Sequence, residues 1–367
     1  MPDVVILTAR FGYGHLSAAN NIRQAFQEEF PDLSVEVVDP FQEVNPGYYE
    51  RVQKLYRFAS TRVPAAWYMF FLLTDRTRLG ASWILSNRKA AAFFGGFEDR
   101  FRPRLLITTY PELTSVLDRF QSAPAARACP VVSVVTDSIT ISRAWTRGYS
   151  DLMCVADPLS ARSLESMGVP AGRIRVTGFP TPPRFTELRP QPTVREGRRL
   201  LTILYLPNFD AGHLRRILEL LGPRPDVRIV LALGKREDLI RECQAMAPRL
   251  ACELEVNGWI PDVCYRMFEA DLVVTKAGGA TVHEAIAAGC PVVITNVTPG
   301  QEEGNARLVE QMELGLAMWR RRDFPKVLNF LSGFDLETAD RLRRNVERVR
   351  HVDASRQIAR LAAGLIR

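Results

Sequence analysis

The stretch "TKAGGATVHEAIAAG", residues 275–289, decides the fold of this chain. The apolar run before it has the pattern of a buried parallel strand, which we expect to end at Thr275. A helix is predicted to begin near Thr281, because Thr281 and Glu284 have the T-x-x-E spacing of a capping box. Gly289 is of the residue type that commonly ends a helix. A strand, a glycine turn and a helix in this order form the repeating unit of doubly wound sheets.

Two adjacent glycines, Gly278 and Gly279, occupy the predicted turn. Without side chains they leave backbone amides bare at the start of a helix, where the helix dipole attracts an anion. The pair therefore favours a phosphate site. The same kind of turn also occurs in proteins without a ligand, and Glu284 alone has a purely structural explanation as half of the capping box.

The next predicted loop, "TPGQEEGNA" at 298–306, places polar side chains after a buried strand. Pro299 and Gly300 are typical of a turn. Side chains rich in hydrogen-bond acceptors suit a ligand with several hydroxyl groups, such as a sugar; here they are Gln301, Glu302, Glu303 and Asn305. The alternative is a solvated loop that caps the next helix at Asn305. Together the two loops indicate a diphosphate that carries a sugar.

The rest of the chain repeats the strand-and-helix pattern in two halves. Apolar runs of strand length alternate with helical patterns up to the charged segment 189–199, which contains two prolines, and then begin again. We therefore predict two Rossmann-like domains with parallel sheets, 1–185 and 200–335. C-terminal helices over 336–367 are expected to pack back on the first domain. Two such sheets in tandem predict a cleft at the carboxyl ends of their strands, where ligands bind.

The composition argues against several classes of site. The 367 residues include six cysteines without a C-x-x-C pair, which argues against a zinc site or a disulfide framework. The chain enters a predicted strand at once, without the pattern of a signal peptide, so a cytoplasmic protein is expected. We predict no metal and no cofactor.

Basic charge is concentrated in the segment 45–105. It holds eleven Lys/Arg and four Asp/Glu, and 11 − 4 = +7 equals the net charge of the whole chain. The apolar run 63–74 within it is shorter than the about 20 residues that span a bilayer. We expect it to lie in the membrane interface through Trp67, Tyr68, Phe70 and Phe71. A core helix is the alternative. No nucleic-acid-binding motif accompanies the charge, so an anionic membrane surface is favoured over nucleic acid.

The segment 275–306, "TKAGGATVHEAIAAGCPVVITNVTPGQEEGNA", closely resembles the donor-site signature of glycosyltransferase family 28. Within that family it is most similar to bacterial diacylglycerol glucosyltransferases and plant-type monogalactosyldiacylglycerol synthases. "FGYGHLSAA" at 11–19 resembles the family's N-terminal G-x-G-H loop. Five shorter matches follow in family order, so the resemblance spans most of the chain: "TTYP", "VTD" with a later Trp, "VTGFP", "LGKREDL" and "NGWIPD".

This resemblance implies a GT-B fold, with two Rossmann-like parallel-sheet domains facing across a cleft, and an inverting transfer of a hexose from a UDP-sugar. It places the uracil near Ile260, the ribose at Glu284 and the phosphates at the turn of Gly278 and Gly279. The implied donor-binding set, with Gln301 and Glu302 on the sugar hydroxyls, is Gly14, Gly234, Ile260, Lys276, Gly278, Gly279, Thr281, Glu284, Pro299, Gly300, Gln301, Glu302 and Asn305.

The acceptor that the resemblance favours is diacylglycerol or a similar lipid. Such a substrate stays in the bilayer, so the enzyme must come to it. The basic, aromatic segment 45–105 gives a physical reason for docking on anionic lipid. We therefore expect a peripheral protein on the inner face of the cell membrane.

Two residues are candidates for the base that takes the proton of the acceptor hydroxyl. His15 lies in the glycine loop at a predicted strand end, and an imidazole near its ordinary pKa accepts a proton at neutral pH. Asp137 ends another predicted strand and is the alternative base, or the group that orients the base. The helix N-terminus near Thr281 and cationic side chains would stabilise the leaving diphosphate without a metal.

Two segments depart from the family pattern. Ser142 stands near the place where the most similar members carry a histidine. Pro207, Asn208 and Asp210 occupy a turn that is glycine-rich in most members, and only Gly212 remains. These departures keep three alternatives open: a transferase acting on another lipid or a soluble acceptor, a non-catalytic protein that binds a nucleotide sugar or a lipid, and a UDP-sugar epimerase on the same fold.

Overall fold

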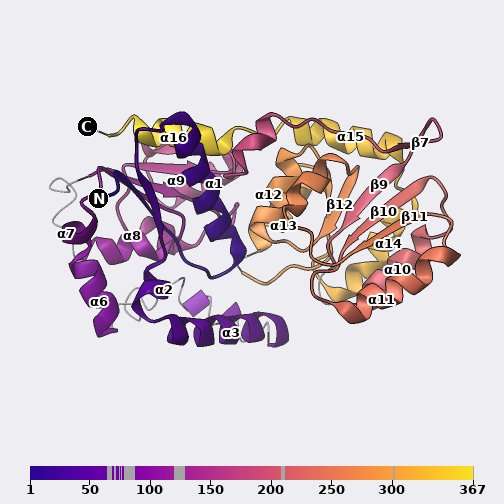
Figure 1. The fold of residues 1–367 in the computed structure, drawn as a ribbon, viewed down its shortest axis with the longest axis horizontal. Coiled ribbons are helices and arrows are strands. Elements are labelled where there is room, and N and C mark those ends of the chain that lie inside the picture. The colour runs from indigo at the N-terminus through magenta and orange to yellow at the C-terminus, as the bar shows by residue number, and fades with distance from the viewer. Residues whose placement is uncertain are drawn as a thin grey trace. The chain divides into compact units, whose positions relative to one another are not determined.

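The computed structural model describes residues 1–63, 68, 69, 72, 73, 75, 77, 87–119, 129–207, 211–300 and 302–366. The chain forms two compact units (Figure 1). Unit 1 comprises residues 1–186, 298–304 and 351–367, and unit 2 comprises residues 187–297 and 305–350. The linker predicted over 189–199 thus lies at the start of unit 2, where it forms the short hairpin of β7 (Val194–Arg195) and β8 (Arg198–Arg199).

Unit 1 is built on a six-stranded sheet in the order β2-β1-β3-β4-β5-β6. Its neighbouring strands all pair in parallel, so Val4 of β1 lies between Val35 of β2 and Leu105 of β3. The order reverses at β1, and the crevice of the sheet therefore opens at the carboxyl ends of β1 and β3. The strands are β1 (Val4–Leu7), β2 (Val35–Val38), β3 (Leu105–Thr108), β4 (Val131–Val134), β5 (Leu152–Val155) and β6 (Ile174–Val176).

Unit 2 carries a second parallel sheet of six strands, in the order β11-β10-β9-β12-β13-β14. Counted from its first strand, this is the 3-2-1-4-5-6 order of dinucleotide-binding folds, whose crevice lies between the first and fourth strands. Those two strands are β9 and β12. The strands are β9 (Leu201–Tyr205), β10 (Val227–Ala232), β11 (Glu253–Asn257), β12 (Leu272–Thr275), β13 (Val292–Ile294) and β14 (Gly315–Ala317). The predicted alternation of strands and helices is confirmed.

The helices fill the intervals between the strands. In chain order they are α1 (Tyr13–Glu29), α2 (Pro40–Val44), α3 (Pro46–Arg62), α6 (Arg88–Gly95), α7 (Phe97–Phe101), α8 (Glu112–Leu117), α9 (Pro158–Ser166), α10 (Ala211–Leu221), α11 (Glu237–Met246), α12 (Gly279–Ala287), α13 (Glu303–Gln311), α14 (Phe324–Ser332), α15 (Leu336–Glu347) and α16 (Ala354–Ala363). Short 3₁₀ turns are η2 (Arg143–Thr146), η3 (Ala171–Arg173), η4 (Pro183–Thr186), η5 (Ala247–Arg249), η6 (Val263–Phe268) and η7 (Arg321–Asp323).

Both faces of the sheet in unit 1 are buried, because alternate residues of a strand point to opposite sides. Val4 and Ile6 of β1 pack with α1 and α16, whereas Val5 and Leu7 pack with α6, α7 and α8. This double burial explains why β1 is apolar at consecutive positions rather than alternating. The sheet of unit 2 has its own core, which includes Tyr205.

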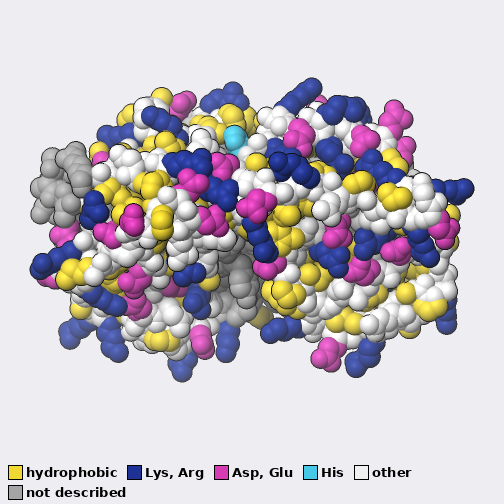
Figure 2. Space-filling view, turned by 45° about the horizontal axis from the view of Figure 1, so that its top comes forward, with side chains coloured by type: hydrophobic (Ala, Val, Ile, Leu, Met, Phe, Trp, Pro, Cys, Tyr) yellow, Lys and Arg dark blue, Asp and Glu magenta, His cyan; other side chains and the backbone are white. Residues whose placement is uncertain are grey.

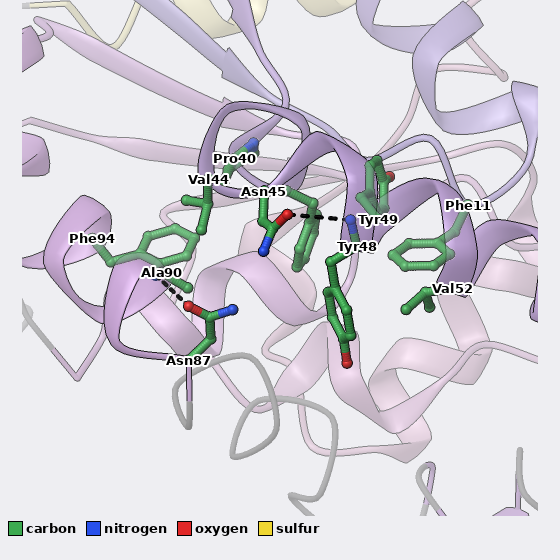
Figure 3. Close-up of a pocket in the computed structure, with 11 residues that line it drawn as sticks. Phe11, Pro40, Val44, Asn45, Tyr48, Tyr49, Val52, Asn87, Ala90 and Phe94 are labelled. Carbon is green, nitrogen blue, oxygen red and sulfur yellow. Dashed lines mark hydrogen bonds between the residues drawn. The ribbon is translucent and has the colours of Figure 1, made fainter.

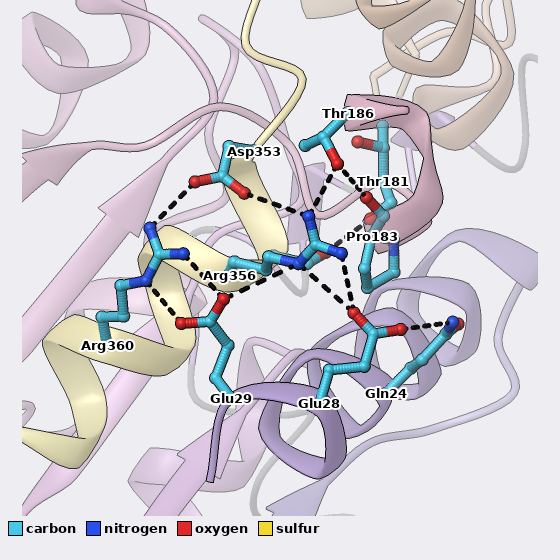
Figure 4. Close-up of polar contacts among 10 residues, drawn as sticks. Gln24, Glu28, Glu29, Thr181, Pro183, Thr186, Asp353, Arg356 and Arg360 are labelled. Atoms are coloured by element: carbon cyan, nitrogen blue, oxygen red, sulfur yellow. Dashed lines mark hydrogen bonds and ion pairs between the residues drawn. The ribbon is translucent and has the colours of Figure 1, made fainter. Parts of the chain in front are cut away.

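The C-terminal helix α16 is part of unit 1 and packs against α1 (Figure 1). Two arginines fasten its outer side (Figure 4). The guanidinium of Arg360 donates to both carboxylate oxygens of Glu29, each at 2.7 Å, and Arg356 donates to Glu28 at 2.9 Å. The preceding helix, α15, belongs to unit 2, so the segment 336–367 divides between the units instead of acting as one element.

Charged side chains of both signs are intermixed on the molecular face that Figure 2 displays. Ion pairs are frequent among the described residues; Arg266, for example, pairs with Glu255 at 3.0 Å and with Glu269 at 2.9 Å. No helix within the described part of the chain is both long and apolar enough to cross a membrane.

Candidate active site

His15 lies at the crevice of unit 1, where β1 and β3 end. His15 was predicted to lie in a loop. Because α1 already begins at Tyr13, His15 belongs to the first turn of that helix. Gly12 precedes that turn with φ 92°, a conformation that favours glycine, and this is what allows β1 to turn sharply into α1. The His15 side chain is only 7% exposed.

The hydrogen bonds of His15 settle its tautomer. Its Nδ1 lies 2.8 Å from the carbonyl oxygen of Thr109, the residue after β3. A carbonyl only accepts, so Nδ1 carries the proton and Nε2 keeps a lone pair. The Oγ1 of Thr136, just after β4, lies 2.8 Å from the same Nδ1, and the Tyr110 ring meets the imidazole edge-on at 5.2 Å between centroids. His15 is therefore held as a neutral imidazole whose basic nitrogen is Nε2.

The electrostatics of His15 favour the same neutral form. Burial lowers the pKa of His15 to about 4, because removing water penalises the imidazolium. The Thr109 hydroxyl also donates to the backbone carbonyl of His15 at 3.0 Å, which fixes the first turn of α1 to the end of β3. The ring is thus oriented by two strand ends and is unprotonated at Nε2 at neutral pH, and its pKa lies below the ordinary value on which the prediction of a base rested.

Asp137, the other candidate base, follows Thr136 at the end of β4. Its Oδ2 accepts a hydrogen bond from the indole Nε1 of Trp145 at 2.8 Å. Burial raises the pKa of Asp137 to about 6, despite that hydrogen bond, and the charge of Asp75 adds to the rise. His15 and Asp137 lie in the same unit but bind different groups, and Thr136, which contacts His15, directly precedes Asp137.

Ser142 has a structural role that explains the departure from the family pattern. Its hydroxyl donates to Asp75 at 2.7 Å and accepts from the amide of Ala144, so it caps η2. Asp75 also accepts from the amide of Arg143 at 2.8 Å.

Three residues that support the site were not predicted as site residues from the sequence: Asp75, Thr109 and Thr136. The signals for the two threonines were their place directly after strands and their position within the matched segments "TTYP" and "VTD".

The glycine turn of unit 2 lies at the carboxyl end of β12, beside the reversal of strand order. The helix α12 begins at Gly279, with Gly278 as its N-cap. Because the helix starts two residues before Thr281, the predicted capping box between Thr281 and Glu284 is wrong, and no side chain caps this helix. The helix ends as predicted, with Gly289 at φ 81° just beyond Ala287.

Gly278 has no backbone reason to be glycine. Its φ of −68° and ψ of 128° are open to any residue, and N-cap positions usually carry Ser, Thr, Asp or Asn. The amides of Gly279, Ala280 and Thr281 have no acceptor within the helix by position, and no side chain in the described residues caps them. The site therefore presents amides and a positive helix end with no Cβ in front of them.

Glu284 and Asn305 flank this turn within unit 2. Glu284 lies on α12, and burial raises the pKa of its carboxyl to about 7. Asn305 lies inside α13, which begins at Glu303, so the alternative that it caps this helix is wrong. Its Nδ2 donates to the carbonyl of Ala277 at 2.9 Å. Its buried Oδ1 has no hydrogen-bond partner in the described part of the chain.

The remaining predicted donor residues lie in both units. Lys276 is exposed beside the turn, and Gly234 donates its amide to the carbonyl of Gly258 at 3.0 Å, near half-buried Ile260. In the loop 298–304, Glu302 accepts from the amide of Thr298 at 3.0 Å and Glu303 from that of Gly300 at 3.0 Å. Pro299 and Gly300 form the turn, Gly300 with φ 85°, whereas Gln301 lies outside the described residues.

This loop packs closely within unit 1 on the strand end that carries Asp137. A Cβ placed on Gly304 would come within 1.6 Å of the carbonyl oxygen of Ser138, the residue after Asp137. Glycine is therefore required at position 304. Gly14 lies beside His15 in the first turn of α1. Unit 1 thus brings together Gly14, His15, Asp137 and the loop 298–304, and unit 2 brings together the glycine turn, Glu284 and Asn305.

The membrane residues predicted in the run 63–74 are only partly described. Trp67, Phe70 and Phe71 lie outside the described residues, whereas Tyr68 is helical and half-buried. Met69 and Leu73 of the same run are 66% and 53% exposed. A helix buried in the core would cover these two side chains.

Comparison with known proteins identifies what the chain resembles. The family described as monogalactosyldiacylglycerol (MGDG) synthase matches residues 15–181. The chain is 26% identical to a processive diacylglycerol beta-glucosyltransferase of Bacillus subtilis (strain 168), over 97% of this chain and 93% of that protein. A protein of the same name from Bacillus licheniformis is 24% identical, with the same coverage. These matches confirm the resemblance inferred from the sequence.

Solved structures establish the fold. MurG of Acinetobacter baumannii superimposes with a TM-score of 0.63 at 15% identity, covering 99% of this chain and all of that one. UGT71G1 of Medicago truncatula, solved with UDP-glucose, gives a TM-score of 0.59 at 11% identity, covering 99% and 98%. The predicted GT-B fold is confirmed.

Proposed function

We propose that this chain is an inverting glycosyltransferase that moves a hexose from a UDP-sugar to a lipid acceptor, most simply diacylglycerol. The observation that carries the proposal is the uncapped N-terminus of α12, which follows β12 at the crevice of the unit 2 sheet. Two relatives that match almost the whole length of this chain are diacylglycerol glucosyltransferases, and they supply the substrate class.

The donor's diphosphate would bind the amides at the start of α12, where Gly278 and Gly279 allow close approach. Glu284 would accept hydrogen bonds from the ribose hydroxyls, and these bonds are strongest when its carboxyl is ionised. Asn305 offers one more acceptor through its unpartnered Oδ1. Gly234 and Ile260 would contact the uracil side, and Lys276 would add positive charge near the phosphates. The loop of Pro299, Gly300, Gln301 and Glu302 would bind the sugar.

His15 is the proposed base. Its Nε2 would take the proton of the acceptor hydroxyl while the hydroxyl oxygen bonds to the anomeric carbon and the carbon–oxygen bond to the diphosphate breaks. The hydroxyl becomes strongly acidic only as the new bond forms, so an imidazole with a pKa near 4 accepts the proton late in the step. The departing UDP keeps the electron pair, and the α12 amides would stabilise its new charge. Asp137 is the alternative base.

The membrane face of the enzyme is proposed to be α3 and the segment that follows it. Six large apolar side chains are exposed here: Tyr48, Leu55, Phe58, Val63, Met69 and Leu73. Exposed Arg51 and Lys54 on the same helix would meet anionic headgroups. Apolar and basic side chains on one short stretch suit a peripheral contact with the inner face of the cell membrane.

The test is to incubate the protein with a panel of UDP-hexoses and vesicles that contain diacylglycerol, followed by mass spectrometry and anomeric analysis of the lipids. Glycosyl-diacylglycerol with inverted anomeric configuration is expected. UDP release that no lipid stimulates would contradict the proposal. UDP binding without any transfer would point to a nucleotide-sugar-binding protein, and conversion of the sugar without an acceptor would point to an epimerase.

A further inference from the structure

Unit 1 contains a cavity of about 250 Å³ that none of the predicted site residues lines (Figure 3). It lies among α2, α3 and α6 and the loop that leads into α1. Its lining is mainly apolar and aromatic: Phe11, Pro40, Phe41, Val44, Asn45, Tyr48, Tyr49, Val52, Asn87, Ala90 and Phe94. A cavity of this size is smaller than the 300–1,000 Å³ typical of drug-sized ligands, so it suits part of a molecule.

The polar side chains in the lining are already engaged elsewhere. Asn45 caps α3 by accepting from the amide of Tyr48, and Asn87 caps α6 by accepting from the amides of Lys89 and Ala90 (Figure 3). Their carbonyl oxygens therefore serve the helices rather than a ligand. The hydroxyl of Tyr49 accepts from the amide of Arg10. What remains for an occupant is mainly apolar surface, together with the Nδ2 groups of the two asparagines.

One wall of the cavity is connected to His15 by two successive ring contacts. Phe11, four residues before His15, stacks on Tyr110 with ring centroids 5.8 Å apart. Tyr110 in turn contacts the His15 ring at 5.2 Å. The helix α3 also holds the loop itself, because Tyr49 and Gln53 bind the backbone amide and carbonyl of Arg10. An occupant of the cavity would thus lie two aromatic rings from the proposed base.

The other side of the cavity continues to the surface along α3. Tyr48, Val52 and Leu55 follow each other at i, i+4 and i+7, so they share one stripe of the helix. Tyr48 and Val52 line the cavity, whereas Leu55 is 66% exposed. A long, thin, apolar molecule could therefore extend from the protein surface along α3 into the cavity.

We propose that this cavity takes the end of one acyl chain of the lipid acceptor and so helps to hold that lipid on the unit that carries His15. The proposal rests on the proposed function and names how that site would select its acceptor. The cavity is too small for two acyl chains, so one chain enters it and the other remains outside. Acceptors without an acyl chain would lose this contact.

The experiment fills the cavity from one of its buried walls. Ala90 lines the cavity on α6, and Ala92 is an exposed residue of the same helix that does not line it, so Ala90→Phe and Ala92→Phe form a matched pair. Equilibrium dialysis measures binding of radiolabelled dioctanoylglycerol to the full-length protein without any UDP-sugar. Ala90→Phe is expected to weaken binding about tenfold, as when roughly two methylene groups lose their burial, and Ala92→Phe less than about twofold.

The outcomes separate this proposal from the proposed function. Binding of dioctanoylglycerol that Ala90→Phe weakens, without any transfer by the wild type, would support the cavity and contradict the transferase. Transfer to dioctanoylglycerol with an unchanged KM in Ala90→Phe, or equal weakening by Ala92→Phe, would overturn the cavity. If Ala90→Phe lacks a cooperative thermal transition, Ala90→Met fills the same space with a flexible side chain and decides the question.

Discussion

At the scale of the residue, the Nδ1 of His15 and the carbonyl of Thr109 are 94 positions apart in the chain, yet their contact decides which ring nitrogen is basic. The sequence indicated His15 as a base because of its residue type and its glycines. It could not predict the tautomer, because the partner is a backbone carbonyl that carries no residue identity. The same holds for the low pKa of His15, which follows from burial.

The role of His15 is tested by two isosteric substitutions. His15→Asn places an amide nitrogen near the position of Nδ1 and retains the bond to Thr109, but it lacks Nε2. We expect the transfer rate to fall by about 10²–10⁴-fold with unchanged affinity for UDP, because only the base is lost. His15→Gln places its amide nearer Nε2 and should be as inactive, since an amide accepts no proton at neutral pH. Steady-state kinetics and UDP titration measure both effects.

Asp137 gives the competing prediction for pH. Because its pKa is raised to about 6, its carboxylate becomes protonated as the pH falls through 6. If Asp137 were the base, kcat at saturating UDP-sugar would fall below that pH. With His15 as the base, whose pKa is near 4, we expect kcat to stay level between pH 8 and pH 5. A loss of kcat centred on pH 6 that is absent from the residual activity of Asp137→Asn would show that Asp137 is the base.

Glu284 is predicted to strengthen UDP binding and to lower the free energy of unfolding. Its folded pKa of about 7 exceeds the ordinary value of 4.5, so the folded state holds the proton more tightly. The free energy of unfolding therefore falls as the pH rises from 4.5 to 7, and the destabilisation by the ionised carboxyl is fully present above pH 7. Glu284→Gln should raise the unfolding free energy at pH 8 by about 1–3 kcal/mol and weaken UDP binding at least about tenfold.

Thermal unfolding and calorimetric titration at pH 8 measure the two effects of Glu284→Gln. Glu337→Gln, at an exposed position of α15, is the control and should change neither quantity. A loss of stability together with full donor affinity would show that Glu284 is purely structural.

At the scale of the element, the strands and the glycine turn were predictable because buried parallel strands are apolar at consecutive residues and stop at glycine. The residue at which α12 begins could not be predicted in the same way. The T-x-x-E spacing of Thr281 and Glu284 favours a capping box, but the helix begins at Gly279 and places both residues beyond its cap. The alternative that Asn305 caps the next helix also failed, because Asn305 lies inside α13 and donates to the carbonyl of Ala277.

Gly278→Ser tests why this helix begins without a cap. Serine fits the observed φ and ψ of Gly278 and is a preferred N-cap, so its hydroxyl should bind an amide that glycine leaves open. We expect the unfolding free energy to rise by a few tenths of a kcal/mol, since glycine is itself a tolerated cap. Chemical denaturation measures the change. A marked loss of stability would show that the turn needs glycine for packing.

At the scale of the whole molecule, the order of residues along the chain does not show which residues belong to the same unit. The loop 298–304 and the helix α16 both belong to unit 1, although most of the chain before them builds unit 2. The sequence predicted that C-terminal helices over 336–367 pack back on the first domain; α16 belongs to unit 1, where its apolar face completes the core over α1, and α15 belongs to unit 2.

The contribution of α16 to unit 1 should come from burial more than from its ion pairs. Ile358 is fully buried against the sheet, and Ile358→Ala is expected to destabilise the protein by about 2–5 kcal/mol. Arg360→Ala removes an exposed pair with Glu29 and should cost less than about 1 kcal/mol. Urea denaturation of the two variants measures both. A larger loss for Arg360→Ala would mean that the ion pairs hold this helix.

The central claim is that the start of α12 binds the diphosphate of a nucleotide, and calorimetric titration of UDP and of uridine tests it most directly. The account predicts that the wild type binds UDP far more tightly than uridine. In Gly278→Ser, the hydroxyl occupies one of these amides and a Cβ stands in front of the others, so the affinity for UDP should fall towards that for uridine. Equal UDP affinity in the wild type and Gly278→Ser, with the fold intact, would contradict the account.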